Sequence, residues 1–156
     1  MIRLEEMTKM HVDSVAELEK KTFPVPWSKK AFEDELKNKL AKYIVAIDEE
    51  SERVIGFGGM WQIINEANIT NIAVDEQYRN KGIATAIMNK LEEIAIAEEM
   101  IGLTLEVRVS NMKARSLYTK LGYKLEGIRK EYYEDNREDA LIMWKYLIDE
   151  ELIISK

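Results

Sequence analysis

The sequence predicts a single α/β domain with a mixed, mostly antiparallel sheet of about seven strands and about four helices on both faces of the sheet. Its 156 residues suit one hydrophobic core. Some segments alternate apolar and polar residues with the two-residue period of a strand, and others repeat apolar residues about every 3.6 positions, as helices do. These segments follow the order β-α-α-β-β-β-α-β-α-β-β along the chain, and this order predicts the fold class.

Two helices are predicted after a first short strand. Thr8 can cap a helix that runs to about Lys21. The segment Phe23–Ser28 ends it, and Ser28 can cap the next helix. His11, the single histidine, is expected on the surface of the first helix. The strands predicted around these helices are Ile2–Glu6, Lys42–Ile47, Val54–Ile64 and Ile69–Val74.

The second half of the chain contains the clearest helix, Gly82–Met100, which has one continuous apolar stripe. Leu103–Val109 alternates like a strand, and Asn111 can cap a further helix that stops at Leu121–Tyr123. The last two predicted strands are Tyr123–Glu131 and Asp139–Tyr146. We assign residues 1–148 to the domain and residues 149–156 to a C-terminal tail.

Composition excludes several classes of protein. The chain has no cysteine and one histidine, which rules out disulfides and thiolate catalysis and argues against a metal site. Its net charge of −6 disfavours nucleic acid and favours a basic protein or an amine as partner. No apolar run approaches the roughly 18 residues that span a bilayer, and Met1–Thr8 does not resemble a signal peptide. We therefore expect a cytoplasmic protein, a monomer or weak dimer, without membrane or nucleic-acid partners.

A candidate anion site lies between a predicted strand and the clearest helix. The N–H groups of a first helical turn have no partner within the helix and attract anions. Gly82 allows close approach of a phosphate, and Arg79 and Lys81 add positive charge. The segment lacks the glycine pattern of a P-loop or a dinucleotide fingerprint. A surface turn whose glycine starts a helix remains the alternative.

These residues carry a resemblance to a known family. Arg79–Ala84 fits the Q/R-x-x-G-x-G/A coenzyme A loop of the GNAT superfamily of N-acetyltransferases, and Leu105–Asn111 with Leu117–Tyr123 resembles the second half of its fold. More narrowly, the chain resembles the ribosomal-protein-alanine N-acetyltransferases (the RimI type). That similarity rests on Pro26–Ser28, Asn71–Asp75, Leu105–Asn111, Tyr132–Tyr133 and Arg137–Ala140. Asn136 stands where a glycine is frequent, and Asp149–Lys156 extends beyond the usual end.

The resemblance implies acetyl-CoA as co-substrate and no metal. The backbone edge of Ile72, Ala73 and Val74 would meet the thioester oxygen and the pantetheine amides. Asn111 would hydrogen-bond the pantetheine arm, cap its helix, or do both. The loop residues implied to bind the cofactor are Arg79, Asn80, Lys81, Gly82, Ile83, Ala84 and Thr85.

The resemblance also implies an acid and a base. Glu106 would take a proton from the amine through one water, and Tyr118 would protonate the thiolate. A free α-amine, with a pKa of about 8 against about 10.4 for lysine, needs little help to lose its proton. The alternatives are a solvated strand carboxylate for Glu106 and a packed aromatic for Tyr118.

The substrate slot is expected to involve aromatic and acidic side chains. Tyr132 and Tyr133 are neighbours on a presumed strand, so at most one of them would line the slot. Glu138, and Asp139 beside it, would attract a protonated N-terminus unless they are ordinary surface charges. The other candidate walls are Pro26 and Trp27, and core packing is an equal alternative for Trp27.

The leading hypothesis is thus an N-terminal protein acetyltransferase acting on a protein N-terminus, with the N-terminal alanine of a small-subunit ribosomal protein as the implied target. A polyamine-type acetyltransferase would use the same cofactor with a deeper acidic pocket. A non-catalytic acyl-CoA-binding module would keep Arg79–Ala84 but have no need of Glu106 and Tyr118.

Overall fold

A computed structural model of the chain describes residues 1–148. The predicted tail, residues 149–156, lies outside the described residues. The chain forms two compact units, which are described separately below. The first comprises residues 1–61 and 70–93, and the second comprises residues 62–69 and 94–148 of the described chain.

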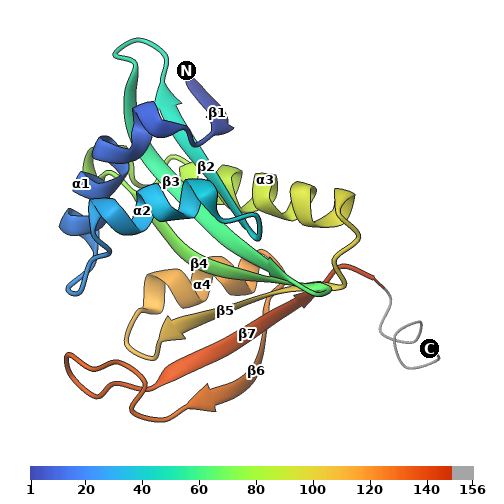
Figure 1. Cartoon of the computed structure of the whole chain (residues 1–156). Helices are drawn as coiled ribbons and strands as arrows, with labels where there is room; N and C mark the ends of the chain where they lie inside the picture. The colour runs from blue at the N-terminus through green and yellow to red at the C-terminus, as the bar shows by residue number, and fades with distance from the viewer. Residues whose placement is uncertain (149–156) are drawn as a thin grey trace. The chain divides into compact units, whose positions relative to one another are not determined.

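The helices and strands follow the predicted order (Figure 1). The strand order is β1-β2-β3-β4-β5-β7-β6, with β4 and β5 parallel and the pairs β1–β2, β2–β3, β5–β7 and β6–β7 antiparallel. This confirms the predicted α/β fold with a mixed, mostly antiparallel seven-stranded sheet. The elements are β1 (Ile2–Glu6), η1 (Lys9–His11), α1 (Val12–Thr22), α2 (Lys29–Lys37), β2 (Ala41–Asp48), β3 (Arg53–Ile63), β4 (Glu66–Val74), η2 (Glu76–Tyr78), α3 (Ile83–Ala97), β5 (Gly102–Arg108), α4 (Met112–Lys120), β6 (Lys124–Arg129) and β7 (Ala140–Tyr146).

The first unit buries apolar side chains on both faces of its strands. Helices α1 and α2 cover one face (Figure 1), where Phe32 packs edge-on against Tyr43 and Phe57. Helix α3 covers the other face with its predicted apolar stripe. Two adjacent glycines of β3 show how closely each face is covered. A Cβ on Gly58 would meet side chains of α3, and a Cβ on Gly59 would meet the ring of Tyr43 on the opposite face.

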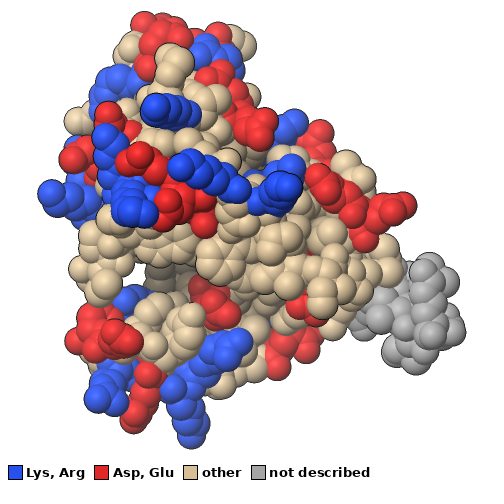
Figure 2. All heavy atoms as spheres, in the orientation of Figure 1, with Lys and Arg blue, Asp and Glu red and all other residues tan. Residues whose placement is uncertain are grey.

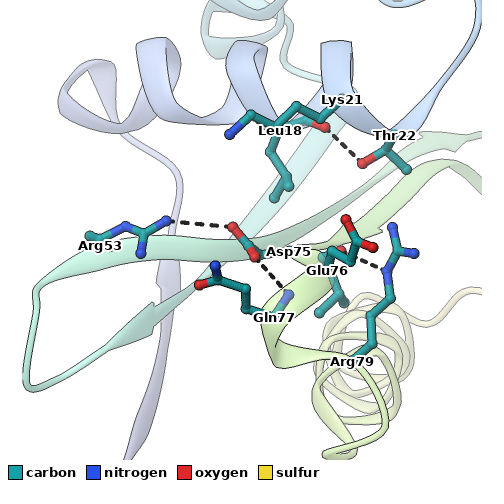
Figure 3. Close-up of a pocket in the computed structure, with 9 residues that line it drawn as sticks. Leu18, Lys21, Thr22, Arg53, Asp75, Glu76, Gln77 and Arg79 are labelled. Carbon is teal, nitrogen blue, oxygen red and sulfur yellow. Dashed lines mark hydrogen bonds and ion pairs between the residues drawn. The ribbon is translucent and has the colours of Figure 1, made fainter.

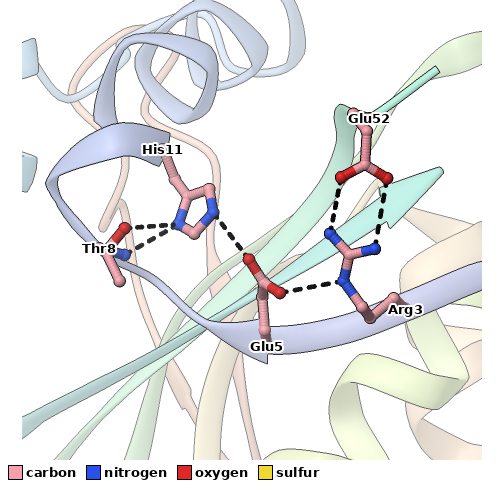
Figure 4. Close-up of polar contacts among 5 residues, drawn as sticks. All are labelled: Arg3, Glu5, Thr8, His11 and Glu52. Carbon is pink, nitrogen blue, oxygen red and sulfur yellow. Dashed lines mark hydrogen bonds and ion pairs between the residues drawn. The ribbon is translucent and has the colours of Figure 1, made fainter. Parts of the chain in front are cut away.

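The expectation that His11 lies on the helix surface is wrong, because the side chain is only 9% exposed. Its ring sits at the start of α1, where Nδ1 accepts a hydrogen bond from the Thr8 N–H at 2.9 Å (Figure 4). Nε2 therefore carries the proton and lies 3.0 Å from Glu5 Oε1. Glu5 in turn contacts Arg3, which also pairs with Glu52. The ring thus satisfies a backbone donor ahead of α1.

The second unit is built on β5, β7 and β6. Strand β5 pairs with β7 from end to end, and Glu66–Asn68 of β4 pairs in parallel with Gly102–Thr104 of β5. The apolar side chains of β5 are buried, as their alternation predicts. Helix α4 begins at the predicted cap, where Asn111 Oδ1 accepts from the Ala114 N–H at 3.1 Å.

The surface of α1 and α2 carries charges of both signs (Figure 2). Lys29 Nζ lies 2.8 Å from Asp13 Oδ1, and Lys30 Nζ lies 3.2 Å from Asp34 Oδ2. Exposed pairs of this kind contribute little to stability, so the aromatic core beneath is what holds these helices. Among the described residues, none of the helices has both the length and the apolarity that a bilayer crossing requires.

The close approach of Tyr43 to β3 generates a stability prediction. We expect Gly59→Ala to lower the free energy of unfolding by about 1–3 kcal/mol, because the new methyl group must displace a buried ring. Gly127→Ala is the matched control, since its Cβ would lie at an ordinary 3.6 Å from Ile142. Urea unfolding followed by tryptophan fluorescence measures both variants. Equal stability of the two variants would contradict the packing described here.

Candidate functional site

In the first unit, the segment after β4 is fixed by polar contacts at both ends of η2. The Asp75 N–H donates to the Ile55 carbonyl at 2.7 Å, and its carboxylate accepts from the Gln77 N–H at 2.9 Å. At the other end, the Tyr78 hydroxyl donates to Asp48 Oδ2 at 2.6 Å. The chain therefore leaves η2 from a defined position.

The predicted anion loop follows directly. Asn80 has φ 63° and Gly82 has φ 76°, so the backbone turns sharply twice before α3 begins. The first hydrogen bond of α3 runs from the Ala86 N–H to the Gly82 carbonyl at 3.0 Å, which leaves the N–H groups of Ile83–Thr85 without an acceptor in the helix. A Cβ on Gly82 would meet nothing within 4 Å, so there is room for a ligand atom. This geometry fits a phosphate group.

The two cations of the loop contact groups of the same segment, namely a backbone carbonyl and the ring of a tyrosine. Arg79 Nε donates to the Val74 carbonyl at 3.4 Å, and Lys81 Nζ lies 5.4 Å from the centre of the Tyr78 ring. Arg79 also lines a hollow of about 370 Å³ beside the end of β4 (Figure 3). Two cations that the sequence analysis did not single out, Lys21 and Arg53, share that hollow.

The strand before the loop has backbone groups that the ladder with β5 does not use. That ladder involves only Glu66–Asn68 of β4. Ile72, Ala73 and Val74 lie further along β4, and Ala73 is only 3% exposed. The predicted edge for the pantetheine amides is therefore a short, regular stretch of strand.

The segment between α1 and α2 brings the first two predicted substrate residues to different environments. Pro26 is exposed. Trp27 is half-buried, with its ring 5.5 Å from that of Phe32 and 6.2 Å from that of Trp61. The packing alternative for Trp27 therefore has direct support, while the ring edge stays partly open to solvent.

In the second unit, Glu106 lies near the end of β5 with its side chain 22% exposed. Its Oε1 lies 3.6 Å from Arg129 Nε on β6. Because side chains two apart on a strand share a face, Arg108 stands on the same face of β5 as Glu106. A partly exposed carboxylate beside an exposed cation is accessible to a proton donor and to water.

Tyr118 lies on α4 with its ring 5.9 Å from that of Tyr123. Loss of hydration raises the pKa of Tyr118 to about 12, and the nearby Tyr133 adds to this shift. The hydroxyl therefore keeps its proton throughout the pH range in which proteins usually work. The packed-aromatic alternative and the predicted acid role both agree with this placement.

The expectation that Tyr132 and Tyr133 lie on a strand is wrong. β6 ends at Arg129, and both tyrosines lie in the loop that follows, so the argument from alternating faces does not apply. Tyr132 is 47% exposed, whereas Tyr133 is half-buried. Burial raises the pKa of Tyr133 to about 12, Arg108 opposes this shift, and Glu106 adds to it. Tyr133 is thus electrostatically coupled to both Glu106 and Tyr118.

Arg108 organises this loop, and the sequence analysis did not identify it as a site residue. Its guanidinium binds Asp135 at 3.0 and 3.1 Å and stacks on the Tyr133 ring, 3.9 Å from the ring centre. It also lies 3.4 Å from Glu138 Oε1. The position of Arg108 two residues after Glu106 was the available signal, because it places both on one strand face.

Glu138 is held by several donors. Its Oε2 accepts from the Ser110 N–H at 2.6 Å, and these hydrogen bonds from Ser110 lower the pKa of Glu138 to about 2. Asn136 and Arg108 contact the other oxygen. The carboxylate is therefore ionised at any working pH, and it ties the end of β5 to the loop before β7.

Neither unit offers an obvious metal site. Within residues 1–148, no group of three or more His, Asp or Glu side chains is arranged to hold a metal ion. The open space at Gly82 and the free N–H groups of α3 instead suit the phosphates of a nucleotide-like ligand.

The fold and the geometry of the loop before α3 are those expected of a coenzyme A-dependent acyltransferase. The chain belongs to the acetyltransferase (GNAT) family, whose sequence profile matches residues 12–123. It is therefore an N-acetyltransferase, and its family uses acetyl-CoA.

Three similar proteins have names that specify the acceptor of the acetyl group. The chain is 34% identical over 151 residues to the ribosomal protein bS18-alanine N-acetyltransferase of Haemophilus ducreyi, which covers 92% of this chain and 99% of that protein. A Bacillus subtilis protein described as a candidate for the same activity is 42% identical over 134 residues, 85% of this chain and 87% of the relative. The crystal structure of the ribosomal-protein-S18-alanine N-acetyltransferase from Escherichia coli has a TM-score of 0.86 at 28% identity and covers 96% of this chain and 97% of its own.

The open space at Gly82 allows a test of the anion loop. We expect Gly82→Glu to abolish acetyl-CoA binding in calorimetry, because a carboxylate would occupy the space meant for phosphate. Gly82→Ala separates charge from backbone strain, since it carries the strain of φ 76° without a charge. Affinity for acetyl-CoA that survives in Gly82→Glu would remove the loop from the cofactor site.

Proposed function

We propose that the protein transfers the acetyl group of acetyl-CoA to the α-amine of a protein N-terminus, namely the N-terminal alanine of ribosomal protein bS18. The similarity to bS18-alanine N-acetyltransferases along most of the chain carries this proposal. Acetyl-CoA supplies an activated acetyl thioester when bound. The remaining chemistry falls to the protein, which must accept a proton from the amine and donate one to the departing thiol sulfur.

Glu106 is proposed as the base. Its carboxylate is partly exposed and lies on the same strand face as Arg108. An α-amine has a pKa of about 8, so a carboxylate acting through one water is sufficient to accept its proton near neutral pH. Glu106 Oε1 lies 3.6 Å from Arg129 Nε, within reach of a water that could relay the proton.

Tyr118 is proposed as the acid. Its hydroxyl, with a pKa raised to about 12, is protonated when the amine attacks. As the carbon–sulfur bond breaks, the proton moves from the Tyr118 oxygen to sulfur, and solvent restores it.

The cofactor is proposed to bind along the end of β4 and the start of α3. Ile72–Val74 would pair with the pantetheine amides and offer an N–H to the thioester oxygen. The loop from Arg79 to Thr85 would bind the pyrophosphate through its free N–H groups and its cations. Asn111, already the cap of α4, has a carbonyl oxygen in use and an NH₂ group that remains for the pantetheine arm.

In the first unit, Pro26 and Trp27 are proposed to contact the acceptor peptide. In the second unit, Tyr132 and Tyr133 are proposed to contact it from the loop that Arg108 holds, and Tyr133 is the less exposed of the two. The ionised carboxylate of Glu138 would attract the peptide ammonium while it keeps its contacts with Ser110 and Arg108.

The acceptor assignment is tested by measuring thiol release from acetyl-CoA with a panel of amines. The panel contains peptides beginning with alanine, serine or methionine, an N-terminally blocked peptide with an internal lysine, and a polyamine. We expect release with the alanine peptide of bS18 sequence. Release with the polyamine alone would retain the enzyme class and overturn the acceptor, and acetyl-CoA binding without release for any acceptor would favour a non-catalytic module.

Glu106→Gln tests the base. We expect kcat to fall about a hundredfold while the affinity for acetyl-CoA is retained, because the amide cannot accept the proton. Glu126→Gln, an exposed glutamate on β6, is the matched control and should keep the wild-type rate. Single-turnover kinetics and calorimetry provide the two readouts. A wild-type rate in Glu106→Gln would return the side chain to an ordinary strand carboxylate.

The raised pKa of Tyr118 predicts the pH profile. We expect kcat/KM to rise as the peptide amine deprotonates near pH 8 and then to stay level to about pH 10. The level region follows because Tyr118, with a pKa raised to about 12, remains protonated there. Tyr118→Phe should lower kcat about a hundredfold, whereas the exposed Tyr146→Phe should not. A descending limb below pH 10 in the wild type that disappears in Tyr118→Phe would contradict the high pKa.

A further inference from the structure

Glu19 is the one acidic side chain among residues 1–148 that is buried, with 2% of its surface exposed. It lies on α1 at a position of the inward stripe that also contains Val12 and Val15. Burial raises the pKa of Glu19, because the ionised form loses its hydration, and hydrogen bonds from Trp27 and Asn71 oppose that rise. A carboxylate in such a position is costly, and an apolar side chain would serve packing as well.

The contacts of Glu19 explain why a carboxylate is present. Its Oε2 accepts a hydrogen bond from the backbone N–H of Trp27 at 2.9 Å, and its own backbone carbonyl accepts from the N–H of Phe23, also at 2.9 Å. One residue therefore binds both ends of the segment between α1 and α2. Pro26 lies inside this closed segment and is exposed.

The second oxygen of Glu19 connects to β4. Oε1 accepts from Asn71 Nδ2 at 3.0 Å, and Asn71 Oδ1 accepts from the hydroxyl groups of Thr70 at 2.8 Å and Tyr43 at 3.3 Å. These hydroxyls are themselves 3.0 Å apart. The partners fix the orientation of the Asn71 amide, because only its NH₂ can face the carboxylate.

We propose that Glu19 is a positioning residue for the acetyl acceptor. Its hydrogen bonds form a lock that holds the segment Phe23–Trp27 against Asn71 of β4. Asn71 lies one residue before Ile72, where the strand edge proposed to bind the cofactor begins. This inference rests on the proposed function, in which Pro26 and Trp27 contact the acceptor peptide. The lock keeps Pro26 and Trp27 at a fixed position relative to β4, the strand proposed to present the acetyl group. It therefore governs productive binding of the acceptor, and the affinity for acetyl-CoA is independent of it.

The pattern of donors and acceptors in this network permits a test in which the carboxylate of Glu19 and the amide of Asn71 trade positions. In Glu19→Gln, one oxygen still accepts from Trp27, but the new NH₂ faces the NH₂ of Asn71. In Asn71→Asp, two carboxylates face each other. The double variant Glu19→Gln/Asn71→Asp restores every hydrogen bond, because the glutamine NH₂ donates to the aspartate, whose other oxygen accepts from Thr70 and Tyr43. Glu17→Gln, an exposed change on the same helix, is the matched control.

Two readouts report on the lock. The first is amide hydrogen exchange at the Trp27 N–H in the free enzyme, which needs no substrate. We expect exchange to accelerate about tenfold in Glu19→Gln and in Asn71→Asp, since each change sets two like groups of residues 19 and 71 against each other and so displaces the acceptor of the Trp27 N–H, and to recover in the double variant, where the two groups are complementary again. The second is kinetics with any amine that the wild type accepts. KM for the acceptor should rise about tenfold in each single variant and recover in the double variant, while the calorimetric affinity for acetyl-CoA stays unchanged.

The outcomes separate this inference from the proposed function. If Trp27 exchange and acceptor KM are both unchanged in Glu19→Gln, the lock is overturned, whichever acceptor the enzyme prefers. Exchange that accelerates without a change in acceptor KM also overturns it, because the carboxylate then stabilises the segment without positioning a substrate. A wild type that ignores the bS18 peptide and uses another amine overturns the proposed acceptor alone, and the same variants are then compared with that amine.

Discussion

The packing of α3 against β3 is the constraint on which the first unit depends. Gly56 and Gly58 leave no side chain on that face of β3, and the space is taken by Ile83, Ile87 and Leu91 of α3. Each of these apolar side chains contributes roughly 1.5–3 kcal/mol by leaving water. Because the helix cannot shift without opening this contact, its first turn has a fixed position. The N–H groups before Ala86 are fixed with it, which supports the proposal that this loop binds an anion.

Polar side chains fix the positions of irregular segments in each unit. In the first unit, Asp75 and Tyr78 hold η2, and Glu19 closes the segment between α1 and α2. In the second unit, Arg108 holds the loop of Tyr133 by one bidentate ion pair and one stacked ring. All these contacts bind irregular segments to regular ones. Substrate-facing loops tend to lie at the low end of local stability, so such ties are where specificity is maintained.

The two proposed proton carriers differ in their surroundings. Glu106 is partly exposed and lies 3.6 Å from Arg129. Tyr118 has lost hydration, which favours the neutral phenol and raises its pKa to about 12. The different surroundings of the two side chains support the different roles proposed for them.

The sequence by itself determined the order of the elements, the apolar faces of α3 and β5, the caps at Ser28 and Asn111, and the glycine directly before α3. These features depend on residues close together along the chain, where periodicity and capping act. Tertiary structure decided the burial of His11, the loop position of Tyr132 and Tyr133, and the clamps made by Glu19 and Arg108. The clamps made by Glu19 and Arg108 depend on partners far away along the chain, namely Asn71, 52 positions from Glu19, and Asp135, 27 positions from Arg108. A charged side chain shows its type in the sequence, but only the fold brings it to the donors that determine what it does.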